Sequence, residues 1–401
     1  MSAVDRIFVV DPVRHDRRGH HWHFAEGVLR EAAEKGFAVQ FFVAKSAAGR
    51  TMPGPGFHPI FRHGLYRPVT GVRSESLETD YRLGSAAFRD DLLATTEFDP
   101  GPHDLILVPT ASLRNLGGLA AWRTATGNRT PLAFLFHDIL PEGTALAPGS
   151  SEFAVARNAG SAMRAAGSAA PYRIGATNPA LAAQLSAAFD VDVPVLPLPH
   201  WYALEPPSDQ PVYQPHARNT VSVAFLGELR RDKGGHLLPA IATLLRQNGD
   251  RVRLVAQAGF AEDTLMAPLQ ALARQGHVDL VSRHLSNPEF ARFIRDSPLM
   301  LLPYQRDRYV SRISGPFAFA VAAARPCIVP DGTWMSGEID AGRAAGVTYA
   351  SDTPQAIADA IGRAVENLPA LTASATERAA TWRRNDGTAL MAALAEWAGR
   401  R

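Results

Sequence analysis

Short apolar runs alternate with longer amphipathic stretches along most of the chain. The first two runs are Arg6–Pro12 and Ala38–Ala44, and the amphipathic stretch His23–Gly36 between them ends in a glycine. Further runs and one more amphipathic stretch follow, namely Asp104–Pro109, Pro131–His137, Ser151–Gly167, Tyr172–Thr177 and Val193–Pro199. Such runs predict buried strands, and helices between them predict right-handed crossovers within a mostly parallel sheet.

The pattern stops between residues 201 and 219, where prolines and polar residues show no periodicity. It then starts again, with apolar runs at Val221–Gly227, Val252–Gln257, Val278–Ser282, Leu299–Tyr304 and Pro326–Pro330 and amphipathic stretches at Gly235–Gly249 and Thr353–Leu368. We therefore predict an α/β protein of two tandem Rossmann-like domains with a cleft between them. The expected bounds are 1–200 for the first domain, 201–219 for a linker and 220–375 for the second domain. Residues 376–401 should form a C-terminal helical segment that packs back on a domain, and the first domain is a candidate.

The stretch from Met52 to Ser85 has turn residues and aromatic side chains without helical spacing. A loop of this length in a compact domain often has a function. Two interpretations stay open, a cover over an acceptor site and an irregular or disordered insertion.

Length, charge and cysteine content restrict the class of the protein. At 401 residues the chain exceeds the size, about 300 residues, at which single hydrophobic cores stop growing. The formal net charge of +2 gives no reason to expect a nucleic-acid partner, and the one cysteine, Cys327, excludes an internal disulfide and a cysteine zinc cluster. The N-terminal apolar run is short, and no stretch approaches the ~20 apolar residues that cross a bilayer. We expect a cytoplasmic protein, with peripheral membrane contact still open.

One basic stretch lies where a strand turns into a helix. Phe225–Gly235, with the sequence FLGELRRDKGG, begins as a buried strand that Gly227 closes, and it contains Arg230, Arg231 and Lys233. Ligands of doubly wound domains bind at the carboxyl ends of strands, and a helix N-terminus attracts anions. We predict a phosphate site here, and a solvated turn with three charges is the alternative. Because the lysine precedes the glycines, the stretch differs from the GxxxxGK[ST] loop of phosphoryl-transfer enzymes.

A second stretch with the features of an anion site runs from Leu301 to Ile339. Ser314 predicts the N-cap of an alanine-rich helix, and Gly315 allows a ligand to approach the backbone N–H groups. Arg312 is close enough in sequence to reach the same anion. The alternative is a capped core helix without a ligand.

Together these stretches resemble the donor domain of a known enzyme family. The segment FLGELRRDKGGHLLPAI, followed by LLPY, RISG and AAARPCIVPDGTWMSGEI, is similar to GT-B glycosyltransferases, and most of all to the retaining family 4 enzymes (glycosyl transferases group 1). Motif-level resemblance covers Val221–Ile339, and in the first domain it rests on Gly19 and on FHDILP, Phe136–Pro141. It implies transfer of a sugar from a nucleoside-diphosphate sugar to a glycan, lipid-linked or other acceptor. It also implies retention of configuration and no metal or other cofactor.

The resemblance implies roles for individual residues. For the donor diphosphate it implies Gly19, Arg230, Arg231, Lys233, Arg312, Ser314 and Gly315. For the nucleoside and sugar it implies Gly227, Glu228 and Glu338, although family members usually have arginine in place of Glu228. His137 would lie beside the transferring sugar as a catalytic residue, and Asp138 would orient that sugar. The transition state would resemble an oxocarbenium ion, and the leaving phosphate would accept the proton of the acceptor.

The chain departs from the family around the donor sugar. Members have two glutamates eight positions apart, and the corresponding residues here are Ser311 and Phe319. Three interpretations stay open: a rebuilt site, a protein that binds without catalysing, and a different register across the loop. A rebuilt site would use Arg308, Arg312 and Glu338 in place of the glutamates. A different register would use Asp307 instead.

The histidine-rich stretch HDRRGHHWH, residues 15–23, raises the question of a metal. Only the combination of His15, His20 and His23 has helical spacing, and zinc would need a further ligand. We therefore expect no metal. In this interpretation His20 or His21 lines the cleft and the neighbouring aromatic residues, Trp22 and Phe24, pack in the core.

Other function classes fit the sequence less well. A nucleotide-sugar epimerase would need paired acids and bases at the sugar, and no such pair stands out. A dinucleotide oxidoreductase would need GxGxxG after a first strand, which neither domain has. A catalytically divergent or inactive sugar-nucleotide-binding protein remains the alternative to a glycosyltransferase.

Overall fold

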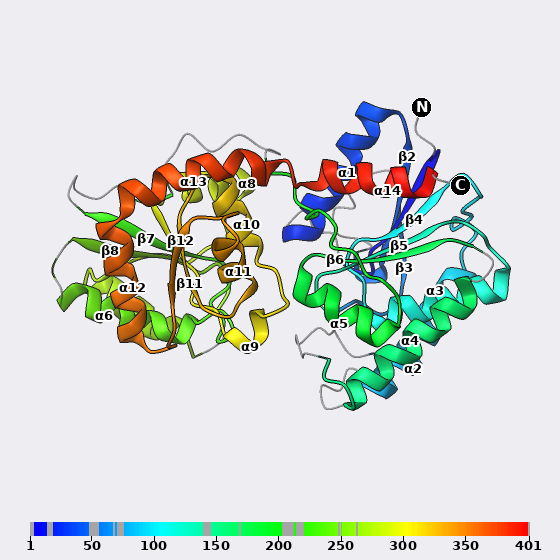
Figure 1. Ribbon diagram of the computed structural model, residues 1–401, viewed down its shortest axis with the longest axis horizontal. Helices are drawn as coiled ribbons and strands as arrows, with labels where there is room; N and C mark the ends of the chain where they lie inside the picture. Colours follow the sequence, from blue (N-terminus) through cyan, green and yellow to red (C-terminus); the bar gives the residue numbers. More distant parts are fainter. Residues whose placement is uncertain are drawn as a thin grey trace. The chain divides into compact units, whose positions relative to one another are not determined.

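The structure is a computed structural model in which the chain forms two compact units (Figure 1). It describes residues 4–13, 19–47, 56–66, 69, 76–138, 146–167, 170–202, 212–213, 220–247, 249, 251–261 and 264–399. Unit 1 consists of Met1–Trp201 together with Asn385–Arg401, and unit 2 consists of Tyr202–Arg384.

Unit 1 is built on a parallel sheet with the strand order β3-β2-β1-β4-β5-β6. Its strands are β1 (Arg6–Val10), β2 (Ala38–Ala44), β3 (Phe57–Phe61), β4 (Leu105–Val108), β5 (Leu132–Phe136) and β6 (Tyr172–Ala176). Its α-helices are α1 (Gly19–Lys35), α2 (Leu77–Leu93), α3 (Leu113–Thr126), α4 (Ser151–Gly167), α5 (Pro179–Phe189) and α14 (Gly387–Gly399), and a 3₁₀ turn covers Lys45–Ala47. Helices α1 and α14 lie on one face of the sheet and α2 to α5 on the other (Figure 1).

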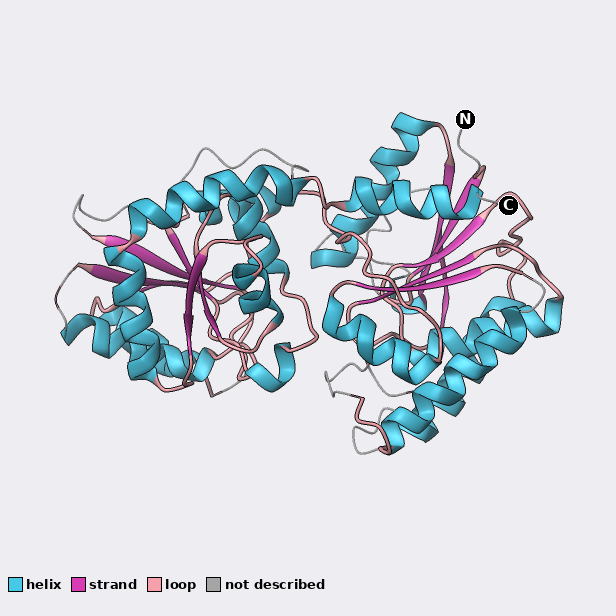
Figure 2. Ribbon diagram, in the orientation of Figure 1, coloured by secondary structure: helices cyan, strands magenta, loops and turns pink. Residues whose placement is uncertain are grey.

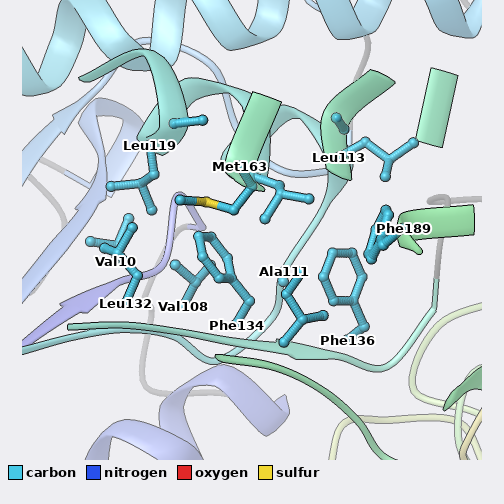
Figure 3. Close-up of a cluster of buried hydrophobic side chains, with 14 of the residues drawn as sticks. Val10, Val108, Ala111, Leu113, Leu119, Leu132, Phe134, Phe136, Met163 and Phe189 are labelled. Atoms are coloured by element: carbon cyan, nitrogen blue, oxygen red, sulfur yellow. The ribbon is translucent and has the colours of Figure 1, made fainter. Parts of the chain in front are cut away.

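Alternation along the strands explains the core on the α3–α4–α5 face. Successive strand residues point to opposite faces, so Leu132, Phe134 and Phe136 of β5 all point the same way. They are fully buried and meet Met163 of α4 and Phe189 of α5 (Figure 3). A parallel sheet with helices on both faces needs such apolar strands.

Unit 2 repeats the same architecture with the strand order β12-β11-β10-β7-β8-β9, again parallel throughout (Figure 2). Its strands are β7 (Val221–Leu226), β8 (Val252–Gln257), β9 (Val278–Val281), β10 (Leu299–Leu301), β11 (Cys327–Pro330) and β12 (Gly346–Tyr349). Its helices are the 3₁₀ turn η2 (Gly235–Leu237), α6 (Leu238–Gln247), α7 (Met266–Arg274), α8 (Asn287–Asp296), α9 (Arg306–Tyr309), α10 (Gly315–Ala322), α11 (Trp334–Asp340), α12 (Pro354–Glu366) and α13 (Leu368–Arg383).

The strand order determines where each unit can bind a ligand. In unit 1 the first and fourth strands, β1 and β4, are neighbours, and in unit 2 the corresponding strands β7 and β10 are neighbours. Helices leave the sheet in opposite directions at such a pair, so a crevice opens beyond the carboxyl ends of these strands. The loops after β1, β4, β7 and β10 therefore border these crevices.

The predicted fold class, with two parallel Rossmann-like sheets, is confirmed, and several elements differ. Val193–Pro199 is not a strand, because only Val195 forms an isolated bridge with Ala176 and the surrounding prolines cannot donate to a ladder. The stretch Met52–Ser85 is not one irregular loop, since it contains β3 and the start of α2, although residues 51–55, 67–68 and 70–75 lie outside the described residues.

The division between the units also differs from the expected bounds. Residues 376–384 belong to unit 2, because α13 continues to Arg383 and buries Trp382 against Phe317 and Trp334. Most of the expected linker, residues 203–211 and 214–219, lies outside the described residues.

The C-terminal helix α14 is fixed to unit 1 through Trp201. A Cβ atom on Gly27 or Gly387 would lie 2.2 or 2.4 Å from the Trp201 ring, so both positions require glycine. The Gly387 N–H also donates to the His200 carbonyl at 2.7 Å.

No helix within the described residues is long and apolar enough to cross a membrane.

Candidate functional site

The loop after β7 is a tight glycine turn that packs against the end of β10. Gly227 has φ +128°, and its N–H donates to the Gln257 side-chain oxygen at 3.1 Å. Gly234 has φ +73°, and a Cβ there would lie 1.9 Å from the Pro303 carbonyl oxygen. Only glycine combines this backbone conformation with so close an approach. The loop is therefore held at the β7–β10 pair by its own backbone.

This loop and the one after β10 bring basic side chains together. Arg230 donates two hydrogen bonds to Asp232, at 2.9 and 2.8 Å, and Arg312 from the β10 loop lies 3.8 Å from the same carboxylate. Lys233 has the Arg312 charge among its electrostatic neighbours. Counting Arg230, Arg231, Lys233 and Arg312 against Glu228 and Asp232 leaves two net positive charges at this edge of the sheet.

Lys233 is the most enclosed cation of the group. Its side chain is 15% exposed, and its Nζ lies 3.6 Å from Glu228 Oε2. Burial lowers the pKa of Lys233, while the Glu228 carboxylate opposes that shift. Glu228 also pairs with Arg230 at 3.1 Å, so one carboxylate is shared between two cations. A compact ammonium held in this way can offer a point charge to a phosphate oxygen.

Ser314 is the N-cap of α10, as the sequence predicted. Its Oγ accepts a hydrogen bond from the Phe317 N–H at 3.3 Å, and its side chain is buried. Pro316 has no N–H group, so the first turn offers fewer donors than an ordinary helix start. Gly315 begins the helix between Ser314 and Pro316.

In unit 1, His137 lies at the carboxyl end of β5, beside the loop after β4. Its Nε2–H donates to the Pro109 carbonyl at 2.7 Å. Its Nδ1 is buried and has no hydrogen-bond partner among the described residues. Burial lowers the pKa of His137 to about 4, so at neutral pH the ring is uncharged and Nδ1 carries a lone pair. The imidazole therefore keeps one hydrogen-bond acceptor, Nδ1, which is enclosed in this structure.

Three side chains form a hydrogen-bonded chain at the carboxyl end of β1. Asp11 follows β1, and its Oδ2 lies 2.8 Å from His21 Nδ1 in the first turn of α1. His21 Nε2 lies 2.6 Å from the hydroxyl oxygen of Tyr66, which follows β3. Asp11 is 1% exposed and Tyr66 is 50% exposed, so the chain runs from the interior to the surface.

A further buried histidine, His200, lies near this region of unit 1. Burial lowers its pKa to about 3, and His137 and His23 lower it further as electrostatic neighbours.

No group of three or more metal-ligating side chains was found among the described residues. His15 lies outside them, and Gly19 is the first residue of α1. Trp22 and Phe24 are buried as expected.

Comparison with known proteins finds structural but no sequence relatives. No protein-family profile matches the sequence, and no curated protein matches it. A UDP-forming α,α-trehalose-phosphate synthase from Burkholderia xenovorans superposes with a TM-score of 0.67 at 14% identity, over 99% of this chain and 100% of that one. Sucrose-phosphate synthase from Thermosynechococcus elongatus gives 0.60 at 15%, over 99% of this chain and 98% of that one. The chain has the GT-B fold.

Within the GT-B fold, the two positions where the resembling family has glutamates carry other chemistry here. Phe319 packs edge-on against the rings of Tyr202 and Phe290, with centroids 5.4 and 5.5 Å apart. Ser311 lies in the loop before α10 and is half-buried. Asp307 is exposed on α9 and accepts the Arg308 N–H at 3.0 Å. At the position that the sequence resemblance assigns to one of the glutamates, the structure therefore has an aromatic cluster.

Glu338, the remaining acidic candidate, is already paired. Its two carboxylate oxygens accept hydrogen bonds from the Arg343 guanidinium at 2.6 and 3.0 Å. Glu338 is buried on α11, whereas the Arg343 side chain is 54% exposed. A ligand of Glu338 would have to share this carboxylate with Arg343. Asp138 is half-buried next to His137, and residues 139–145 beyond it lie outside the described residues.

Sequence reasoning missed Asp11, Tyr66 and His200. Asp11 ended an apolar run that was interpreted only as a strand, and an acidic residue directly after a first strand is the signal that could have drawn attention to it. Tyr66 fell in the unassigned stretch, and His200 directly followed the run Val193–Pro199, which was interpreted as a strand. Neither residue has a local pattern that would indicate its partners.

Proposed function

We propose that the protein is a glycosyltransferase that moves a sugar from a nucleoside-diphosphate sugar to a glycan, lipid-linked or other acceptor. The observation that carries this proposal is the basic loop at the β7–β10 pair, where Gly234 fits only as glycine and Lys233 is enclosed beside Arg230 and Arg312. A crevice at such a strand pair is the usual ligand position in doubly wound domains. Its net positive charge suits a diphosphate.

The names of the structural neighbours support this class of donor and acceptor. The Burkholderia xenovorans neighbour is described as UDP-forming, and a related structure from the same organism holds glucose 6-phosphate. The Thermosynechococcus elongatus neighbour is named as a sucrose-phosphate synthase. Because these neighbours share only 12–15% identity with this chain, they support a class of reaction and leave the donor and acceptor to experiment.

The proposed reaction depends on charge stabilisation at the leaving group. As the bond from the anomeric carbon to phosphate breaks, negative charge grows on the diphosphate and positive charge on the sugar. Lys233, Arg230 and the Gly315 N–H are fixed donors for that negative charge, which is the preorganised electrostatic contribution to catalysis. These cations can neutralise the diphosphate themselves, and we therefore propose transfer without a metal. Retention follows from the family resemblance and is part of the proposal.

His137 has the properties of a hydrogen-bond acceptor for a substrate hydroxyl. Its Nε2–H is committed to Pro109, its ring is neutral, and its Nδ1 lone pair is the acceptor. We place it beside the transferring sugar as the catalytic candidate, with Asp138 next to it. Glu338 and Gly227 remain candidates for the nucleoside and sugar.

A sugar-nucleotide-binding protein without transferase activity is the second candidate. The observation that favours it is the aromatic packing of Phe319, at the position where the resembling family has a glutamate. Binding of a donor alone does not distinguish the two candidates, whereas turnover does.

The test is a turnover assay with the full chain. UDP-, GDP- and ADP-linked sugars are combined with glucose 6-phosphate, free hexoses and soluble glycans, with and without EDTA, and release of the nucleoside diphosphate is measured. The proposal predicts release that depends on one donor and persists in EDTA, and NMR of the product gives its anomeric configuration. Donor binding without release would instead support the non-catalytic candidate, and failure of every donor to bind would contradict both.

A further inference from the structure

Two hydrogen bonds join the carboxylate of Asp11, the imidazole of His21 and the phenol of Tyr66. An ionised Asp11 carboxylate only accepts hydrogen bonds, so in that state His21 Nδ1–H is the donor across the 2.8 Å contact. His21 Nε2 then carries the lone pair and accepts the Tyr66 O–H at 2.6 Å. This is the arrangement by which a buried carboxylate fixes the tautomer of an imidazole that acts as a base.

The surrounding backbone holds all three members in place. The Asp11 N–H donates to Phe42 O in β2 at 3.0 Å, and the Leu65 N–H donates to Pro12 O at 3.0 Å. The Leu65 carbonyl also accepts a hydrogen bond from the buried Arg114 guanidinium. The residue before Tyr66 is therefore tied both to the loop after β1 and to α3. Tyr66 stands edge-on to His21, with ring centroids 5.7 Å apart.

Asp11, His21 and Tyr66 lie at the edge of the sheet where the strand order opens a crevice. Asp11 lies at the end of β1, next to the β1–β4 pair. His137 interacts electrostatically with both Asp11 and His21. Its Nδ1 has no hydrogen-bond partner among the described residues. Burying the polar side chains of Asp11 and His21 costs more free energy than burying apolar side chains would. Buried ionisable pairs of this kind are concentrated at functional sites.

We propose that Asp11, His21 and Tyr66 form a proton relay for the acceptor hydroxyl, an inference that rests on the proposed transferase function. The acceptor oxygen forms a bond to the anomeric carbon while the bond from that carbon to the phosphate oxygen breaks, and the phosphate keeps the electron pair. The acceptor proton passes to the Tyr66 oxygen as the Tyr66 proton passes to His21 Nε2. Asp11 stabilises the imidazolium, which returns its proton to solvent after the product leaves. Tyr66 thus replaces the leaving phosphate as the group that accepts the proton.

The relay assigns different roles to its members. Tyr66 touches the acceptor and is the catalytic residue of the relay. Asp11 acts only through His21 and is a positioning residue. Because the three act as one unit, removing a second member after the first should cost little more.

The experiment uses the full chain with the donor and acceptor that give the highest turnover in the panel above. The variants are Tyr66→Phe, Asp11→Asn and the double variant, with Tyr172→Phe as control. Tyr172 is a half-buried tyrosine at the amino end of β6, away from the carboxyl ends of the strands. Donor dissociation constants from calorimetry show whether each variant still binds the donor, and circular dichroism shows whether it keeps its fold.

The relay predicts that kcat falls by about 10²- to 10⁴-fold in each single variant and no further in the double variant. The donor dissociation constant should stay within about twofold, and the control should keep its kcat. Nitrogen NMR of His21 should show the Nδ1–H tautomer in the native chain and its loss in Asp11→Asn, which tests the positioning role of Asp11. A native kcat in Tyr66→Phe, additive losses in the double variant, or loss of donor binding would overturn the relay while the transferase function stands. Absence of turnover in the native chain with every pair would overturn the proposed function and the relay together.

Discussion

Lowering the pH from 7 to 5 should destabilise unit 1 through its buried neutral histidines. In the folded chain, burial lowers the pKa of His200 to about 3 and that of His137 to about 4. In the unfolded chain both rings titrate near their ordinary pKa of about 6.5. The unfolded state therefore takes up protons first as the pH falls. The stability contribution is fully present above about pH 6.5 and is lost progressively down to the folded pKa values.

The magnitude follows from the two pKa values of each ring. At 1.36 kcal/mol per pKa unit, each histidine lowers the free energy of unfolding by about 2 kcal/mol between pH 7 and pH 5, and the pair by about 4 kcal/mol. His200→Gln removes one titrating ring and should remove about half of this loss. Because carboxylates also titrate in this range, the informative quantity is the difference between the native chain and the variant.

The assay is urea denaturation at pH 7 and pH 5, followed by circular dichroism and by tryptophan fluorescence. The native chain should lose about 2 kcal/mol more than His200→Gln on going to pH 5. An equal loss in both proteins would show that His200 does not lie buried and neutral in the folded state, and the reasoning about unit 1 would be refuted.

Three further predictions concern the backbone and the leaving group. Gly234→Ala should destabilise unit 2 by more than about 2 kcal/mol, because the new Cβ meets the Pro303 carbonyl at a positive φ; thermal unfolding measures this, and an unchanged melting temperature would contradict it. Gly387→Val should detach α14 from Trp201, which limited proteolysis would detect as faster loss of the C-terminal segment than in the native chain. Turnover should persist in EDTA and fall by about tenfold or more in Lys233→Ala, and a metal requirement would refute the assignment of the diphosphate charge to side chains.

The fold followed from local patterns because each strand is an apolar run and each crossover an amphipathic helix. Ala38–Ala44 and Ser151–Gly167 begin and end where the pattern predicted. β3 was missed because FHPIF contains a histidine and a proline, and β12 because GVTY is short and begins with glycine. The false strand at Val193–Pro199 had the apolar composition of a strand but prolines that prevent a ladder.

The candidate site could be predicted only where its residues are local in sequence. Arg230, Lys233 and Gly234 share one turn, and the N-cap Ser314 has its own signal. The contact of Gly234 with Pro303 and the pairing of His21 with Tyr66 join segments that are distant in sequence. Strand order brings these segments together, and no local pattern encodes it.

The central claim is that the loop from Gly227 to Gly235 binds the diphosphate of a nucleotide sugar. Calorimetric titration of the full chain with UDP-, GDP- and ADP-linked sugars tests it most directly, with Lys233→Ala as the variant and Lys45→Ala, an exposed lysine of unit 1, as the matched control. We predict that one donor binds and that its dissociation constant rises by about 10- to 100-fold in Lys233→Ala and stays unchanged in Lys45→Ala. If no nucleotide sugar binds, or if Lys233→Ala binds as tightly as the native chain, this loop is not a diphosphate site.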